Sequence, residues 1–170
     1  KVECMFILED LMQKFSSTNK FVPMGLTFED VKLVDDLQST VTPESVSVTT
    51  SLTPTLKLNI PLLSAAMDTV TEARFATALA KLGGLGVIHK NMTISAQADE
   101  VRKVKTATFD SADFPNAAVD AEGHLLVAGA VGVTNDTVDR VQAMVEAGAD
   151  AIVLDSAHGH SEGVIRKVSE

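Results

Sequence analysis

The stretch NIPLLSAAMDTVTEARFATALAKLGGLGVIHKN, residues 59–91, decides the fold of this chain. It opens with an apolar run at 60–66, which is too short for a buried helix and suits a strand covered on both faces. Residues 73–82 are good helix formers, and the threonines before them offer a helix start. Two glycines stop this helix, and a second apolar strand follows at 85–89. The stretch therefore predicts one βαβ unit.

The same alternation continues along the chain. Apolar runs at 125–133 and 151–154 are predicted to be a third and a fourth strand. Helical patterns follow the strands, and 106–123 has the composition of a loop. Four consecutive strand–helix steps imply parallel strands joined by right-handed crossovers. The fold class is α/β: half of a (β/α)₈ barrel or, alternatively, a complete small doubly wound sheet.

Two of the predicted helices carry large apolar residues on one face. The stripe in the first is Phe75, Leu79 and Leu82, and the stripe in the third is Val138, Val141, Met144 and Val145. Such spacing predicts the side of each helix that packs on the core.

Composition limits the classes of function. At 170 residues the chain fits one domain, although a full eight-stranded barrel typically needs about 250. A net charge of −9 and the lack of Trp and Tyr argue against a nucleic-acid surface. The single cysteine, Cys4, excludes an internal disulfide and fits a reducing cytoplasm. No apolar stretch approaches the ~20 residues of a membrane span, and acidic residues interrupt the amino end where a secretory signal would lie.

Polar residues gather where the predicted strands end. In α/β folds the ligand sites lie at the carboxyl ends of parallel strands, so these residues are the main chemical signal of the chain. The four ends are Ser64-Ala65-Ala66-Met67-Asp68, His89-Lys90-Asn91, Gly132-Val133-Thr134-Asn135 and Asp155-Ser156-Ala157-His158-Gly159.

Each candidate also has a structural interpretation. Asp68 equally suits a helix start, and Lys90 equally suits a solvated turn. His158 and His160 lie near Asp155, but no third metal ligand converges with them, so no metal site is predicted. Asp155 is the more informative carboxylate, because an acid at a strand end can accept both hydroxyls of a ribose. The glycine-rich segment at 83–88 does not match a phosphate-binding fingerprint.

Three strings carry a resemblance to a known family: GLTFEDVKLV from Gly25, LNIPLLSAAMDTVTEARFATALAKLGGLGVIHKNM from Leu58, and LLVAGAVGVTNDTVDRVQAMVEAGADAIVLDSAHGHSEGV from Leu125. They closely resemble bacterial inosine-5′-monophosphate (IMP) dehydrogenases from about Gly25 onward. The resemblance implies a (β/α)₈ barrel assembled as a homotetramer. It also implies oxidation of IMP to xanthosine monophosphate with NAD, through a covalent intermediate on a cysteine.

The resemblance also implies site residues. Ser64, Ala66 and Met67 would border the nucleotide substrate. Asp155, Ser156, Ala157 and His158 would lie along NAD, with Asp155 holding the nicotinamide-side ribose. This role agrees with the interpretation of Asp155 from its place at a strand end.

The sequence departs from the family pattern in two places. Family members usually carry a pair of regulatory cystathionine-β-synthase-like (CBS) modules between the second helix and the third strand, where this chain has only 105–124. The expected organisation is therefore a lead-in at 1–24 and a partial barrel at 25–170 without inserted modules. The chain also ends after its fourth helix, whereas the family's cysteine loop and potassium site lie further on. Cys4 is a poor substitute, so no catalytic residue is expected in this chain.

Two classes of function follow. The chain is expected to be the amino-terminal half of an IMP dehydrogenase, inactive by itself. The alternatives are GMP reductase, which shares the barrel, and a non-catalytic half barrel that binds a nucleotide or assembles with other chains. A half barrel has two unpaired sheet edges, so an oligomer is expected.

Overall fold

The computed structural model describes residues 25–27, 29–32, 34 and 40–170. The predicted lead-in at 1–24 and Cys4 lie outside the described residues. The chain divides into a first unit, Lys1–Ser45, and a second, Val46–Glu170. Within the described part of the first unit, Pro43–Ser45 (η1) forms one turn of 3₁₀ helix.

The second unit is a parallel α/β structure that begins with a small antiparallel hairpin. The hairpin pairs β1 (Thr50–Ser51) with β2 (Lys57–Leu58). Three parallel strands follow in the order β3, β4, β5, which is also their order along the chain. Their bounds, with the helices between them, are α2 (Ala73–Lys81), β3 (Gly86–Ile88), α3 (Ile94–Lys105), β4 (Val127–Val131), α4 (Thr137–Glu146), β5 (Ala151–Leu154) and α5 (Glu162–Ser169).

The strand predicted at 60–66 is wrong in extent, because only Leu63 bridges to Leu85 of the neighbouring segment, in parallel orientation. Pro61 has no N–H for a ladder, and the Ser64 hydroxyl occupies the N–H of Val87. The backbone still joins the sheet at this point, since Leu85 N–H donates to Leu62 O and Ser64 N–H donates to Leu85 O, both at 3.0 Å. Across the sheet, the order is therefore the segment at Leu63, then β3, β4 and β5.

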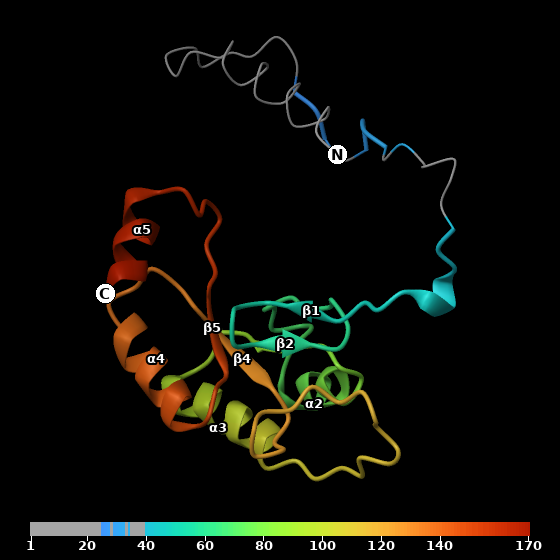
Figure 1. Cartoon of the computed structure of the whole chain (residues 1–170). Helices are drawn as coiled ribbons and strands as arrows, with labels where there is room; N and C mark the ends of the chain where they lie inside the picture. The colour runs from blue at the N-terminus through green and yellow to red at the C-terminus, as the bar shows by residue number, and fades with distance from the viewer. Residues whose placement is uncertain (1–24, 28, 33, 35–39) are drawn as a thin grey trace. The chain divides into compact units, whose positions relative to one another are not determined.

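Two apolar layers cover the two faces of the sheet. The helices form an arc along one face, while the β1–β2 hairpin lies on the other (Figure 1). The helix layer includes Ala76, Val101, Val127 and Met144. The inner layer includes Leu58 of β2 with Val87, Ala128 and Ala130 of the strands. Side chains alternate between the two layers along each strand, as the pleat requires.

The packing corrects part of each predicted helix stripe, although Val141 and Met144 of α4 face the core as predicted. α2 buries Ala73, Ala76 and Ala80, whereas Phe75 and Leu82 are 45% and 59% exposed. α4 buries Thr137 and Met144 and leaves Val138 and Val145 about half exposed. The small residues make contact because the helices approach the sheet closely: a Cβ added to Gly86 would overlap Ala76.

Side-chain hydroxyls cap two of the helices. Thr93 caps α3 by accepting from Ala96 N–H, and Ser161 caps α5 by accepting from Val164 N–H. The N-cap residue of α4 is Asp136, which makes no side-chain cap bond. The residues at 106–123 form turns, as predicted, and end at a single antiparallel bridge between Val119 and Leu125.

Candidate functional site

The carboxyl ends of the parallel strands form one rim. Parallel strands in sequence order place all their carboxyl ends at the same edge of the sheet. The ladder extends past β5, because Asp155 N–H donates to Val131 O at 2.8 Å. With Val131 opposite Leu154, the next pair in register is Gly132 and Asp155. The polar segments predicted at the strand ends are therefore brought together.

The predicted substrate residues lie at the first position of this rim. The Ser64 hydroxyl accepts from Val87 N–H at 2.9 Å, so it replaces a ladder bond. Ala66 packs against the inner layer, and Met67 is 54% exposed. Of these three side chains, Met67 is the one most open to a ligand.

A hydrogen bond ties the first rim position to the second. Asn91 Nδ2 donates to Asp68 Oδ2 at 2.8 Å, and both residues are exposed. Asp68 precedes α2 but is not its N-cap residue, which is Glu72. Asp68 therefore acts as a link between the strand ends rather than as a helix cap.

His89 is a rim residue that turns away from solvent. Its side chain is buried, Nδ1 accepts from Asn91 N–H at 3.0 Å, and Nε2 lies 3.5 Å from Glu72 Oε1. Because Nδ1 accepts, the neutral ring carries its proton on Nε2, which faces the Glu72 carboxylate. His89 fixes the turn after β3 and is not available to a ligand.

The predicted cofactor residues Asp155, Ser156, Ala157 and His158 are all exposed after β5. Asp155 does not cap the helix after Gly159, because Ser161 caps α5. Among the described residues, the Asp155 carboxylate has no hydrogen-bond or ion-pair partner. A carboxylate that is open at a strand end retains its capacity to accept ligand hydroxyls.

Two residues of α3 that the sequence analysis did not identify support the rim from the helix side of the sheet. Gln97 is fully buried, and its amide donates to Ile88 O at 3.2 Å and to Ala130 O at 2.8 Å. Glu100 accepts from Ala73 N–H at 2.7 Å and so caps α2 from a neighbouring helix. Burial raises the pKa of the Glu100 carboxyl, but the Lys103 ammonium and the Ala73 N–H together hold it below its usual value. The sequence signal that could have identified Gln97 is its spacing with Val101 and Val104, which places the three residues on one face of the helix.

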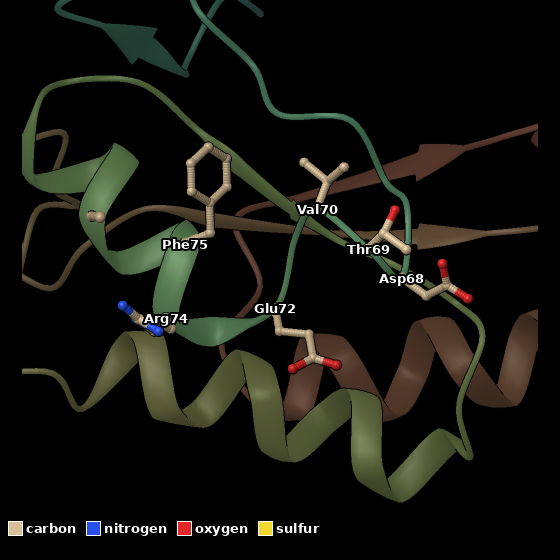
Figure 2. A pocket seen from close by; sticks show the side chains of 7 residues that line it. Asp68, Thr69, Val70, Glu72, Arg74 and Phe75 are labelled. Atoms are coloured by element: carbon tan, nitrogen blue, oxygen red, sulfur yellow. The ribbon is translucent and has the colours of Figure 1, made fainter.

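An open depression of about 460 Å³ lies beside the first rim position, outside the predicted site. Figure 2 shows Asp68, Thr69 and Val70 on the segment that leads into α2, with Arg74 and Phe75 on the helix itself. Two acidic residues, Asp68 and Glu72, and one basic residue, Arg74, line it. The depression marks the edge of the sheet rather than the candidate site.

A charged network lies at the opposite end of the strands. Lys105 Nζ donates to Asp120 at 3.0 Å and to Asp150 at 2.8 Å, while Asp150 accepts from Val127 N–H. Burial raises the pKa of Asp120, but bonds from Lys105 and His124 outweigh it and lower the value to about 2. Within the described residues, Asp120, Glu122 and His124 are the one group with metal-ligand geometry. Lys105 is already bonded to the Asp120 carboxylate, so we assign this network a structural role and not metal binding.

No helix in the described part of the chain is long and apolar enough to cross a membrane.

Comparisons with known proteins extend over most of the chain. The family described as IMP dehydrogenase / GMP reductase domain matches residues 25–170. An inosine-5′-monophosphate dehydrogenase of Borreliella burgdorferi is 41% identical over 186 aligned positions, which cover 89% of this chain and 46% of the relative. Enzymes of the same name from Halalkalibacterium halodurans and Streptococcus pyogenes are each 34% identical, over 260 and 263 positions, covering 88% and 89% of this chain and 53% of each relative. The chain spans about half the length of these curated relatives.

Proposed function

Because this chain belongs to the IMP dehydrogenase / GMP reductase family, we propose that it is about half of a (β/α)₈ barrel that oxidises IMP to xanthosine monophosphate with NAD. The observation that carries the proposal is the open Asp155 carboxylate at the end of β5, on a rim formed by strands in sequence order. That is where α/β barrels hold their ligands.

The sheet supports the proposal of a barrel. Each added strand lies next to the preceding one, so the sheet grows in one direction and does not reverse its order. A doubly wound sheet changes direction at a switch point, which residues 63–154 do not contain. The relatives are about twice as long as the matched part, which leaves them enough chain for further β/α units.

The alignments also support a barrel without inserted CBS modules. Two of them run over 260 and 263 positions, which exceeds the length of this whole chain, so those relatives carry residues that it lacks. The segment at 106–123 is the expected place of the insertion, and here it closes as turns onto β4.

We assign the rim residues as follows. Asp155 accepts the hydroxyls of the nicotinamide-side ribose, and Ser156, Ala157 and His158 lie along NAD. Ser64, Ala66 and Met67 border IMP, with the Ser64 hydroxyl acting through the backbone position that it fixes. NAD, when bound, supplies the hydride acceptor. The potassium ion and a homotetramer belong to the completed enzyme.

The chain by itself is proposed to be catalytically inactive. The reaction implied by the family needs a cysteine thiolate at the strand ends, but the sole cysteine is Cys4. The same fact favours the second candidate, a half barrel that binds a nucleotide without converting it. GMP reductase remains the alternative within the family, and titration with GMP beside IMP separates the two assignments.

The test is a titration of the purified protein with NAD. Charge-assisted hydrogen bonds to ribose hydroxyls contribute about 1.5–3 kcal/mol each, so Asp155→Ala should weaken NAD binding at least about tenfold. IMP binding and the melting temperature should stay close to those of the unchanged protein. Asp139→Ala, an exposed acid on α4, is the matched control. Unchanged NAD affinity in the Asp155 variant would reject the assignment.

A further inference from the structure

Lys90 is a cation at the rim that neither the fold nor the assigned site uses. It follows β3 and is the only Lys or Arg among the residues at 64–68, 89–91, 132–135 and 155–160. Its side chain is exposed, and it has no hydrogen-bond or ion-pair partner in the part of the chain that the structure describes. The neighbouring His89 and Asn91 are both engaged.

The ammonium of Lys90 lies over the inner face of β4. A Cβ added to Gly132 would overlap Lys90 Nζ and would lie 3.5 Å from its Cε. Ala128 and Ala130 belong to the inner layer, so the alternation of the strand directs position 132 to the same inner face. The absence of a side chain at Gly132 leaves the space that the ammonium occupies.

This place is next to Asp155. Gly132 and Asp155 follow the last registered pair of β4 and β5, and neighbouring strands lie about 4.8 Å apart. Ala151 and Val153 belong to the inner layer, so Asp155 is also on the inner face. The Lys90 ammonium thus lies over Gly132, the residue in register with Asp155 on the neighbouring strand, and within residues 40–170 neither charge forms an ion pair.

We propose that Lys90 binds a phosphate group of the nucleotide ligand at this rim, beside the ribose site of Asp155. The inference rests on the proposed function and adds a residue to its site. A ribose carries its phosphate within one sugar length of its hydroxyls, so one ligand can meet both charges. A lysine ammonium binds phosphate as a compact point charge, while the carboxylate cannot. IMP and NAD both supply this chemistry.

The experiment measures dissociation constants of the purified protein for two pairs of ligands. IMP is compared with inosine, and NAD with nicotinamide riboside, because the second member of each pair lacks phosphate. Lys90→Met should weaken binding of the phosphorylated ligand about tenfold or more and leave its unphosphorylated partner unchanged. The pair that shows this difference identifies whose phosphate Lys90 contacts. Lys90→Arg should restore most of the affinity.

Gly132→Ala provides a second variant that keeps the charge. The overlap is with the end of a flexible side chain, so the methyl group should displace the ammonium at little cost in stability. It should weaken phosphate-dependent binding in the unchanged protein but add nothing to Lys90→Met. Lys57→Met, at an exposed lysine of β2, is the control for loss of a positive charge.

Three outcomes would overturn the inference. Equal affinity of Lys90→Met and the unchanged protein for both phosphorylated ligands would make Lys90 a solvated turn residue. A lowered melting temperature with unchanged binding would make it a structural partner of Asp155. An unchanged protein that binds none of the four ligands would reject the proposed function as well, so the two failures are distinguishable.

Discussion

At the scale of single residues, glycines and alanines set how closely the helices approach the sheet. Gly86 on β3 faces Ala76 of α2, and a Cβ there would overlap both the Cα and the Cβ of Ala76. Backbone atoms cannot move aside as a flexible side chain can. The contrast is Gly129, where the overlapping atoms belong to the Met144 side chain.

Gly86→Ala is therefore expected to lower the free energy of unfolding by about 1–3 kcal/mol, the usual range for overpacking a core. Gly159→Ala is the matched control, because no atom lies within 4 Å of the added Cβ. Urea denaturation of both variants measures the difference. Equal stability of the two would show that α2 does not pack on β3 as described.

The Asp120 carboxylate makes the free energy of unfolding depend on pH. Its pKa is lowered from 3.8 to about 2 in the folded chain, so the folded state favours the ionised carboxylate. The stabilisation is complete above the unfolded value of 3.8 and is lost as the pH falls toward 2. The lowering corresponds to roughly 2 kcal/mol at neutral pH, as an upper estimate.

Asp120→Asn should therefore unfold about 1–2 kcal/mol more easily at pH 7, and the difference from the unchanged chain should shrink between about pH 4 and pH 2. Denaturant titrations at several pH values measure this convergence. Glu122→Gln, an exposed neighbour in the same turn, should show neither effect. A pH-independent difference would mean that the amide disturbs the turn rather than the ion pair with Lys105.

At the scale of elements, sequence periodicity predicted strands and helices better than it predicted their faces. The strands at 85–89 and 125–133 are confirmed with shorter bounds, the strand at 151–154 is confirmed with the bounds predicted, and the helices between the strands are confirmed as well. The predicted faces are wrong for Phe75 and Leu82 of α2, which are exposed. The predicted face of α4 is confirmed for Met144 and Val141, which pack in the core, and is wrong for the exposed Val138 and Val145. The spacing of apolar residues identifies one side of a helix but does not tell a contact with the sheet from a contact with another helix.

The candidate site was predictable only in part. The polar strand ends are confirmed as neighbours, since a parallel sheet in sequence order puts them on one rim. The functional assignments of Asp155 and Met67 stay predictions. The engagement of Ser64 with Val87 could not be foreseen, because it depends on the orientation of one hydroxyl. The capping of α2 by Glu100 could not be foreseen either, because Glu100 lies 27 residues away from Ala73 in the sequence.

Glu100 gives a test of packing between elements. Loss of a cap costs about 1 kcal/mol, so Glu100→Ala should lower the free energy of unfolding by that amount through α2. Glu100→Gln keeps an acceptor for Ala73 N–H and should recover part of it. Asp99→Ala removes an exposed pair with Arg102 on the same helix and should cost no more than about 0.5 kcal/mol. Hydrogen exchange at the Ala73 amide reports the cap directly, and unchanged exchange in Glu100→Ala would contradict it.

At the scale of the whole molecule, the sheet has two edges that the described residues do not cover. Leu62 O and Ser64 N–H both bond to Leu85, so the N–H and C=O of Leu63 between them face away from β3. Leu62 and Leu63 are 55% and 46% exposed, and β5 is paired on one side only. Further apolar side chains are exposed near these edges: Met67, Val70, Phe75, Ile165 and Val168.

Such edges pair readily with other chains. We therefore expect the 170-residue chain to self-associate, with a mass that rises with concentration in size-exclusion chromatography with light scattering. Its net charge of −9 opposes the association, so salt should strengthen it.

Leu63→Lys places a charge on the open edge and should shift the chain toward the monomer, because an unpaired lysine resists burial in a paired strand. Leu52→Lys adds the same charge in the hairpin turn, at a side chain of similar exposure, and should leave the association unchanged. Equal dissociation by both would assign the effect to net charge alone. A chain that stays monomeric at high concentration would contradict the expectation that these edges pair with other chains.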